Sequence, residues 1–274
     1  MSLVKAELLK IRTTSTWWTF GLIMLPLWAL AVLFNWATSN FTAQADPSTL
    51  NADQAEQVRV ASEAVNIAAN LYTSGQFFGV LIIMLLGAIL VTNEFFHQTA
   101  TTTFLVTPRR EAVVLAKLAA SALLGLVFWL VMTVLNLIVV PFILNSMNVG
   151  AQLGEGAIWR AIGLNALAFV LWAVLGVGLG VLIRSQIAAT VTLALAYVLG
   201  SFGASILFAV LTTKVAKWIS NLEVLVPTTA SGLMISGTDL PGSPPRWVGA
   251  VVLIGYAVIA GVLGTAIMKR RDVS

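Results

Sequence analysis

Residues 112–144 read AVVLAKLAASALLGLVFWLVMTVLNLIVVPFIL, and Lys117 is the single charged side chain in this stretch. An α-helix rises about 1.5 Å per residue, so about 20 apolar residues are enough to cross the roughly 30 Å hydrocarbon core of a bilayer. The stretch is longer than that, and we expect it to begin in the membrane interface before it enters lipid. It therefore predicts a membrane-spanning helix.

Five further apolar runs are long enough to cross a bilayer, at residues 17–37, 77–92, 158–183, 187–211 and 247–268. The composition of the 274 residues agrees, because 59% are hydrophobic, 9% are charged and the mean hydropathy is +0.95. In an ordinary soluble domain about a quarter of the residues are charged. We therefore predict an all-α membrane protein in which residues 1–274 form one domain of six transmembrane helices, rather than a soluble domain or a disordered chain.

Side chains that carry chemistry are scarce. The chain has no cysteine and one histidine, His97, which excludes a disulfide framework, a thiol nucleophile and a zinc site of several histidines. The sequence also lacks the motifs G-x-x-x-x-G-K-[ST], H-E-x-x-H and G-x-S-x-G. We expect no catalytic residue, no metal site and no cofactor in this chain.

The lysine and arginine residues indicate which ends of the spans face the cytosol. With the N-terminus inside, the inner side holds ten of them: Lys5, Lys10, Arg12, Arg109, Arg110, Lys117, Arg184, Lys269, Arg270 and Arg271. The outer side then holds five: Arg59, Arg160, Lys214, Lys217 and Arg246. Inner segments carry the excess of these cations, so we predict a multi-pass plasma-membrane protein with both termini in the cytosol. The flanking cations also account for the net charge of +4, and nucleic acid is not an expected partner.

Residues 1–16 predict a short helix in the inner interface, since Val4, Leu8 and Ile11 recur at helical spacing. We expect the apolar side of this helix to face the acyl boundary and its cations to bind anionic lipid headgroups. The alternative is that these cations only set the topology.

The outer loop at residues 38–74 predicts a helix that does not span. Asp46 followed by Pro47 is typical of a helix start. The residues that then fall on one helical face are Val58, Ala61, Val65, Ala68 and Tyr72. This pattern favours one amphipathic helix that rests on the membrane domain.

The outer segment at residues 212–246 predicts a hairpin. Pro227 separates two apolar pieces, and each is too short to cross the bilayer. We expect re-entrant or interfacial helices at the outer mouth of the bundle.

Residues 93–111 form the longest cytosolic connection and read NEFFHQTATTTFLVTPRRE. Pro108 indicates a helix boundary or a first turn, and Arg109 and Arg110 place charge at the inner surface. This is the segment against which a cytosolic partner could push. We expect His97 to be a polar surface or packing residue here rather than a catalytic base.

The fifth span carries a row of small residues at four-residue intervals. Its members are Ala188, Thr192, Ala196, Gly200 and Ala204. Small residues let helix backbones approach closely in lipid. We therefore expect this row to pack against another helix, either across a dimer axis or within the chain.

Polar side chains are few inside the spans, and charged ones are almost absent. The polar ones are Asn35, Thr133, Asn136, Asn165 and Tyr197. Such groups bond neighbouring helices or line a path, and bonding is the favoured interpretation. Because the acids and bases of ion-driven carriers are missing at membrane depth, we expect the energy for any transport to come from outside the chain.

These features, in this order, resemble the permease subunits of type-2 ABC exporters. In that family an N-terminal interfacial helix with an E-x-x-K signature precedes six spans, and Glu7 and Lys10 hold those positions here. After the second span the family shows an acid, a G-T pair, P-x-R and a lysine that enters the third span. The matching residues are Glu94, Gln98 with Thr99, Pro108 with Arg109 and Arg110, and Lys117, so that Gln98 replaces the glycine. The stretch LVPTTASGLM at 225–234 is similar to a proline-containing re-entrant hairpin of the family, and the likeness covers nearly the whole chain.

The resemblance implies a half-transporter that exports an apolar or amphipathic substrate, such as a drug, a lipid or a natural product. Two permease chains, identical or different, would form the pathway, and two copies of an ABC ATP-binding subunit would dock from the cytosol and bind ATP and Mg. The implied coupling residues are Glu7, Lys10, Glu94, Thr99, Pro108, Arg109 and Arg110. The first and fifth spans of the family meet across the dimer axis, which would place the small-residue row there. The implied pathway-lining residues are Asn35, Gln76, Tyr197 and Phe202.

Two other functions stay open. A membrane scaffold or immunity protein that binds a partner and moves nothing fits the acid-poor interior equally well. A membrane-embedded enzyme that acts on lipid is the third hypothesis, and the lack of an evident acid, base or metal cluster within the spans argues against it.

Overall fold

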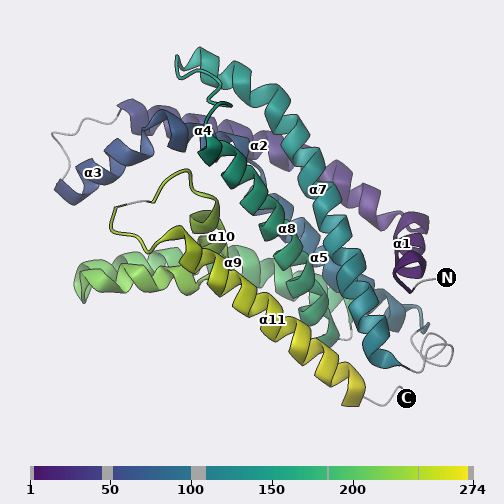
Figure 1. The fold of residues 1–274 in the computed structure, drawn as a ribbon. Helices are drawn as coiled ribbons and strands as arrows, with labels where there is room; N and C mark the ends of the chain where they lie inside the picture. Colours follow the sequence, from purple (N-terminus) through teal and green to yellow (C-terminus); the bar gives the residue numbers. More distant parts are fainter. Residues whose placement is uncertain (1–2, 45–51, 100–108, 184, 240, 271–274) are drawn as a thin grey trace.

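The computed structural model describes residues 3–44, 52–99, 109–183, 185–239 and 241–270, and its elements are helices (Figure 1). In chain order they are α1 (Leu3–Thr13), α2 (Thr16–Gln44), α3 (Ala52–Ala61), α4 (Ala64–Tyr72), α5 (Gln76–Phe96), α7 (Arg110–Ser146), α8 (Gly156–Leu182), α9 (Gln186–Lys214), η2 (Lys217–Leu225), α10 (Pro227–Ile235) and α11 (Arg246–Arg270). The short η2 is a 3₁₀ helix. The described residues contain no strand, which confirms the predicted all-α class.

Six helical stretches are long and apolar enough to cross a membrane: α2, the pair α4–α5, α7, α8, α9 and α11. They confirm the six predicted spans. All except α8 extend past both ends of the predicted apolar run. The helices continue into polar sequence because the helix satisfies the hydrogen bonds of the backbone N–H and C=O groups there as well. Asn93 and Glu94 near the end of α5 are an example.

Helix α8 lies at the centre of the bundle and packs against α5, α7 and α11 (Figure 1). The backbones of α5 and α8 touch, because a Cβ atom on Gly180 would lie 2.7 Å from Ala88 Cα and one on Gly176 would overlap the carbonyl oxygen of Met84. Small residues therefore set the closest helix contact of the fold, as expected where lipid supplies little drive for helices to associate.

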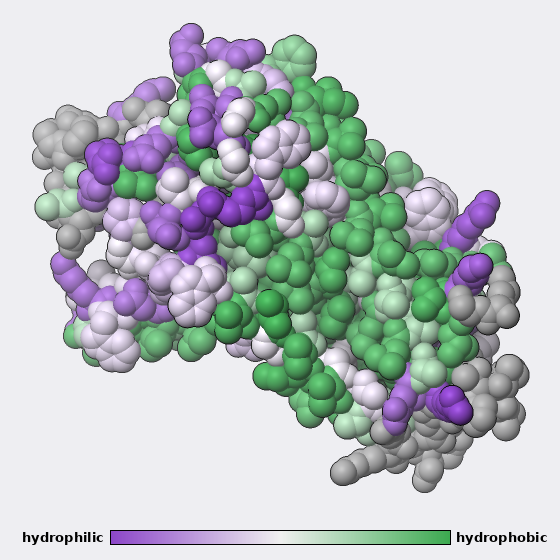
Figure 2. Space-filling view, viewed as in Figure 1, coloured by the Kyte–Doolittle hydropathy of each residue, from purple (hydrophilic) through white to green (hydrophobic). Residues whose placement is uncertain are grey.

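Different helices lie at the two ends of the bundle. The C-terminal ends of α5, α8 and α11 meet the N-terminal end of α7 in one apolar cluster, and α1 lies at the same end, which we call the terminal end (Figure 1). Helices α3, α4 and α10 lie at the opposite end, called the distal end. Figure 2 shows a broad apolar belt between polar surfaces at these two ends. That distribution is typical of a membrane-spanning bundle.

The outer segment at 38–74 contains two helices, so the prediction of one amphipathic helix is wrong. Helix α3 ends at Ala61 and α4 begins at Ala64, with Glu63 in extended backbone between them. The side chain of Asn66 donates a hydrogen bond of 2.7 Å to the Val60 carbonyl and so stabilises the break. Apolar α4 is buried against α7 and α8, whereas most of α3 is exposed or half-buried. The predicted start at 46–47 lies outside the described residues.

Helix α1 confirms the helix predicted before the first span, but its apolar side does not face an acyl boundary. Ile11 is buried in the main core together with Met24, and Leu8 packs against the same core. The side of α1 that also carries buried Glu7 therefore contacts protein, chiefly α7. Lys10 and Arg12 are exposed.

The connection between α9 and α11 matches the predicted division at Pro227. Helix α9 runs to Lys214, so the hairpin starts slightly later than predicted. Pro227 is the first residue of α10, where its missing N–H costs no helical hydrogen bond. Helix α10 packs against α8 and α11 and buries Met234 and Ala230.

Candidate functional site

Four charged side chains from three helices meet at the terminal end, and we call them the ion network. Helix α1 supplies Glu7 and Lys10, α5 supplies Glu94, and α7 supplies Lys117. Lys117 Nζ lies 2.8 Å from Glu7 Oε2 and 2.9 Å from Glu94 Oε1. Lys10 Nζ lies 2.7 Å from Glu7 Oε1 and 2.7 Å from Glu94 Oε1. Two carboxylates and two ammonium groups therefore neutralise one another.

Burial makes this ion network sensitive to the loss of any member. Glu7, Glu94 and Lys117 are 4%, 6% and 1% exposed, whereas Lys10 reaches solvent. Lys117 also donates a hydrogen bond of 3.1 Å to the Leu90 carbonyl, so each of its three N–H groups has an acceptor. Removing ions from water costs several kcal/mol per ion, which is compensated only while the opposite charges are in place.

The charges of the α1 residues are fixed by their neighbours. Burial by itself would raise the pKa of the Glu7 carboxyl, but Lys117 and Lys10 outweigh burial and hold that pKa below its ordinary value. Burial would likewise lower the pKa of the Lys10 ammonium, and the hydrogen bonds to Glu7 and Glu94 instead raise it. Both groups are therefore charged near neutral pH. The ion network acts as a joint that ties α1 to α5 and α7.

The structure brings together three of the predicted coupling residues, Glu7, Lys10 and Glu94. Lys117, the lysine of the third-span signature, is the fourth member of the ion network. Lys10 and Glu94 lie 84 positions apart in sequence, and Glu7 and Lys117 lie 110 positions apart. The fold brings them together where α1 meets α5 and α7. The burial of Glu7, Glu94 and Lys117 assigns these three to holding helices together rather than to direct contact with another chain, whereas Lys10 is exposed.

The remaining coupling residues lie in or beside the connection from α5 to α7. Thr99 is exposed, and its N–H donates to the Glu94 carbonyl at 2.9 Å. Gln98 has a φ of 55°, the left-handed conformation that glycine adopts most easily. Arg109 is exposed and Arg110 begins α7. Pro108 lies outside the described residues.

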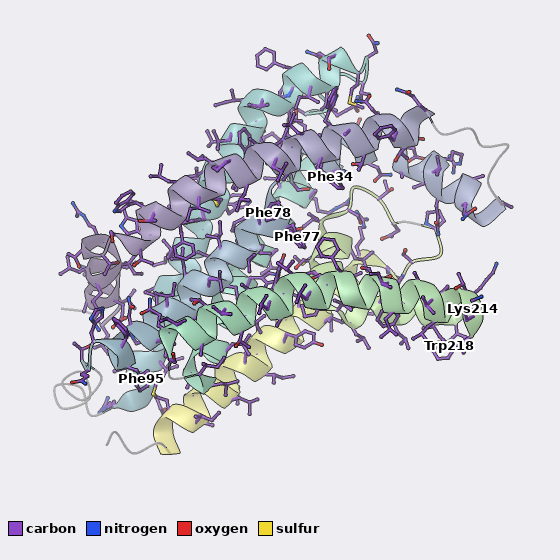
Figure 3. The ribbon with its side chains drawn as sticks, turned by 180° about the vertical axis from the view of Figure 1, so that it is seen from behind. Phe34, Phe77, Phe78, Phe95, Lys214 and Trp218 are labelled. Atoms are coloured by element: carbon purple, nitrogen blue, oxygen red, sulfur yellow. The ribbon has the colours of Figure 1, made fainter. Side chains whose placement is uncertain are left out.

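A cavity of about 730 Å³ lies at the other end of α5. It is partly open and is lined by α2, α4, α5, α9 and α10, by the end of α3 and by the turn that follows α10. Figure 3 shows Phe34, Phe77 and Phe78 in the space between α2 and α9. The volume is in the range of ligand pockets, roughly 300–1,000 Å³.

The lining of the cavity combines polar but uncharged residues with aromatic ones. The polar members are Asn35, Thr38, Ser39, Thr42, Asn66, Asn70, Thr73, Gln76 and Ser236. The aromatic members are Phe34, Phe77, Phe78 and Phe202. Among the described residues that line it, none is acidic, basic or histidine. The described part of the chain also offers no group of three His, Asp or Glu residues that could hold a metal ion.

Three of the four predicted pathway residues, Asn35, Gln76 and Phe202, line this cavity. Tyr197 is not among its lining residues. It is buried, its hydroxyl donates to the Phe77 carbonyl at 2.7 Å, and its ring packs 5.0 Å from that of Phe77. Tyr197 therefore supports the cavity wall by joining α9 to α5, which is the helix-bonding role favoured for polar groups in the spans.

Asn136 has the same helix-bonding role at the turn between α4 and α5. Its side chain accepts a hydrogen bond of 2.7 Å from Trp28 Nε1 and donates to the carbonyls of Tyr72 and Ser74 at 2.9 and 3.0 Å. Gly75, which follows Ser74 in this turn, has a φ of 87°, a value that a residue with a side chain adopts only under strain. Asn136 thus fixes the turn that carries Gln76 to the cavity.

Among the described residues, most of the small-residue row of α9 is not used for packing within the chain. Ala188, Thr192, Ala196 and Gly200 are exposed and Ala204 is half-buried. A Cβ atom on Gly200 would meet nothing within 4 Å. The buried side of α9 consists of other residues, Ala189, Leu193 and Tyr197. The alternative that the row packs within the chain is therefore wrong, and the dimer alternative stays a prediction.

Asn66 and Asn70 both line the cavity but are not among the residues predicted to line a pathway. Their segment was predicted to be a helix that rests on the membrane domain. Their spacing of four residues, which places both on one face of α4, was the available signal.

Comparison with curated proteins finds no match. Comparison with family models matches residues 28–274 to the family described as "Protein of unknown function (DUF2705)". The match begins within α2 and continues to the C-terminus, so it includes the cavity and the α5 and α7 members of the ion network, Glu94 and Lys117. It leaves out α1 with Glu7 and Lys10. Because the match covers well over half of the sequence, the chain belongs to the DUF2705 family.

Proposed function

We propose that the chain is the membrane-spanning subunit of an ATP-driven ABC exporter, coupled to two separate ATP-binding subunits and paired with a second permease chain. The observation that carries this proposal is that α5 joins the ion network to the cavity. Glu94 lies in the last turn of α5, and Gln76 and Phe77 lie in the first. The helical rise between Gln76 and Glu94 is about 27 Å. A displacement of α5 at the terminal end would therefore change the wall of the cavity at the far end.

In this proposal the terminal end faces the cytosol, and the chain lies in the plasma membrane. The ATP-binding subunits, which bind ATP and Mg, contact α1 and the segment between α5 and α7. Arg12 and Arg109 are exposed there and are available to a partner. The buried ion network makes α1, α5 and α7 respond together, because separating α1 would leave Glu94 and Lys117 without half of their charge partners.

The second permease chain, identical or related, is proposed to cover the exposed faces of α2 and α9. Phe34 on α2 and Phe202 on α9 are 67% and 61% exposed although they line the cavity. The small-residue row of α9 is exposed as well. A second chain packed on these faces would bring two cavities toward one dimer axis.

The cavity favours an exporter over the two alternative functions. A scaffold or immunity protein that only binds another protein has no need of a cavity of about 730 Å³ between its helices. A lipid-directed enzyme needs an acid, a base or a metal at its reaction site. The lining of the cavity supplies none of these among the described residues.

The test is co-purification followed by measurement of ATP hydrolysis. A tagged full chain extracted in mild detergent is expected to bring down an ATP-binding subunit, and a substrate is expected to stimulate ATP hydrolysis by the reconstituted complex. Arg109→Ala should lower this stimulation about fivefold or more, the usual lower range of coupling between sites. Lys214→Ala, which removes an exposed cation from the end of α9, is the matched control and should leave it unchanged. Absence of any nucleotide-binding protein in the pull-down would refute the proposal.

A further inference from the structure

We infer that the cavity between α2, α5 and α9 binds a neutral amphipathic molecule that supplies hydrogen-bond donors, and that it discriminates against charged ligands. As a statement about the exported substrate this inference rests on the proposed function. As a statement about binding it rests on the lining of the cavity alone.

The exclusion of charged ligands follows from what surrounds the cavity. None of the described lining residues carries a charge. An ion that enters loses much of its hydration and meets no opposite charge, which costs far more than burying a hydrogen-bonded neutral group. The aromatic lining residues, among them Phe34, Phe77 and Phe78, would instead take the apolar part of a ligand (Figure 3).

The demand for donors follows from the hydrogen bonds that the polar side already makes. Asn35 Nδ2 donates to Ser74 Oγ at 2.9 Å, and Gln76 Nε2 lies 3.5 Å from the Ser231 carbonyl. Neither Asn35 Oδ1 nor Gln76 Oε1 accepts a hydrogen bond from the described residues. These two carbonyl oxygens are therefore acceptors available to a ligand.

Most hydroxyl groups around the cavity are likewise available as hydrogen-bond acceptors rather than as donors. Four of the five lining hydroxyls, those of Thr38, Thr42, Thr73 and Ser236, donate their proton to a backbone carbonyl three or four residues earlier in the chain, and Ser39 is the exception. A hydroxyl that has donated its single proton can only accept from a ligand. Among the lining amides, Asn70 keeps both side-chain N–H groups, and Asn35 and Gln76 keep one each, that bond nothing in the described part of the chain, so acceptor sites outnumber the remaining donors. The cavity is consequently rich in acceptors, and ligand N–H or O–H groups complement it.

The experiment uses four benzophenone probes of similar size that differ in one substituent: a primary carboxamide, an N,N-dimethylcarboxamide, a carboxylate and an aminomethyl group. The full chain in phosphatidylcholine nanodiscs, without an ATP-binding partner, is irradiated with each probe, and the labelled residues are identified by mass spectrometry. The carboxamide is expected to label residues 30–42, 76–78 and 232–237 at least about tenfold more than either charged probe. The dimethyl amide, which is neutral but has no donor, should fall between them.

Two variants connect the labelling to the cavity. Gly232 lines the cavity and a Cβ atom there would meet nothing within 4 Å, so Gly232→Trp should place a large side chain in the space and strongly lower labelling. Gly163→Trp is the matched control, because Gly163 is also helical with open space around it but does not line the cavity. Gln76→Leu removes one acceptor and should lower labelling by the carboxamide without lowering labelling by the dimethyl amide.

The outcomes separate this inference from the proposed function. Equal labelling by charged and neutral probes, labelling that Gly232→Trp leaves unchanged, or no labelling of the cavity residues would overturn the inference. If Gly232→Trp does not fold, an unchanged preference for the carboxamide in Gln76→Leu overturns the donor requirement. A chain that shows the expected labelling but brings down no ATP-binding subunit would refute the exporter and leave the binding site standing.

Discussion

At the scale of single residues, Lys117 is the side chain on which the ion network depends most. It is 1% exposed and holds Glu7 and Glu94 from α1 and α5 at 2.8 and 2.9 Å. Lys117→Met keeps a similar length but removes the charge, so two buried carboxylates are left with Lys10 alone. We expect the change to cost about 3–5 kcal/mol, as is usual when one partner of a buried ion pair is removed. The measurement is the thermal unfolding temperature of the purified chain, which should fall.

A control and a rescue make the Lys117 prediction specific. Lys214→Met removes an exposed lysine from the end of α9 and should leave the unfolding temperature unchanged. Adding Glu94→Gln to Lys117→Met removes a negative charge as well and leaves Glu7 paired with Lys10. The double variant should therefore recover part of the lost stability. An unfolding temperature of Lys117→Met equal to that of the unmodified chain would contradict the role of the ion network.

At the scale of elements, the exposed small-residue row of α9 predicts where two chains meet. Because the chain has no cysteine, single introduced cysteines can test this contact without background cross-linking. If two identical chains meet along the small-residue row, single cysteines placed at 196, 200 and 204 lie near their own copies across the dimer axis. We expect Gly200→Cys or one of its neighbours in the row to form a cross-linked dimer under mild oxidation in membranes, since a disulfide needs Cα atoms within about 7 Å. The readout is dimer on a non-reducing gel.

The matched control for α9 is Val262→Cys on α11. Val262 is 62% exposed and lies on an apolar helix that could equally face lipid. This variant should remain monomeric on the gel. Cross-linking of Val262→Cys in the absence of any cross-link from the row would place the interface between chains on α11 and refute the α9 interface.

The elements also show how far sequence reasoning reaches. The spans are predictable because bilayer thickness alone requires long apolar helices, whatever their neighbours are. The break between α3 and α4 is not, because it depends on the contact of the Asn66 side chain with the Val60 carbonyl and on burial of α4. Asn35, Gln76 and Phe202 were predicted to line a pathway and do line one cavity. That Tyr197 lies behind the wall depends on which way α9 is rotated, which a helix that is apolar all round does not reveal.

The ion network was predictable in its members but not in its geometry. Glu7, Lys10, Glu94 and Lys117 were recognised through a family resemblance, as short signatures in a fixed order. Nothing in their spacing shows that all four side chains meet in one buried cluster, since α1 must first fold back against α7. Long-range ion pairs of this kind need the packing of the helices to be known.

At the scale of the whole molecule, the proposed export function requires the two ends of the bundle to face different compartments, with the ion network on the cytosolic side. The excess of lysine and arginine on one side, ten against five, predicts that α1 and the terminal end are cytosolic. Gly154 lies in the turn that precedes α8 at the distal end, is exposed and has open space around it, so Gly154→Cys reports on that side. Thr13→Cys, at the exposed end of α1, reports on the other.

A membrane-impermeant maleimide added to intact cells is therefore expected to label Gly154→Cys at once and Thr13→Cys only after the cells are lysed. The physical reason is that cations flanking the spans are retained on the cytosolic side during insertion. The chain without introduced cysteine, which has no thiol, gives the background. The reverse pattern would place the ion network outside the cell, away from cytosolic ATP. An exporter driven through α1 and α5 could not then work, even if the cavity bound its neutral ligand as inferred.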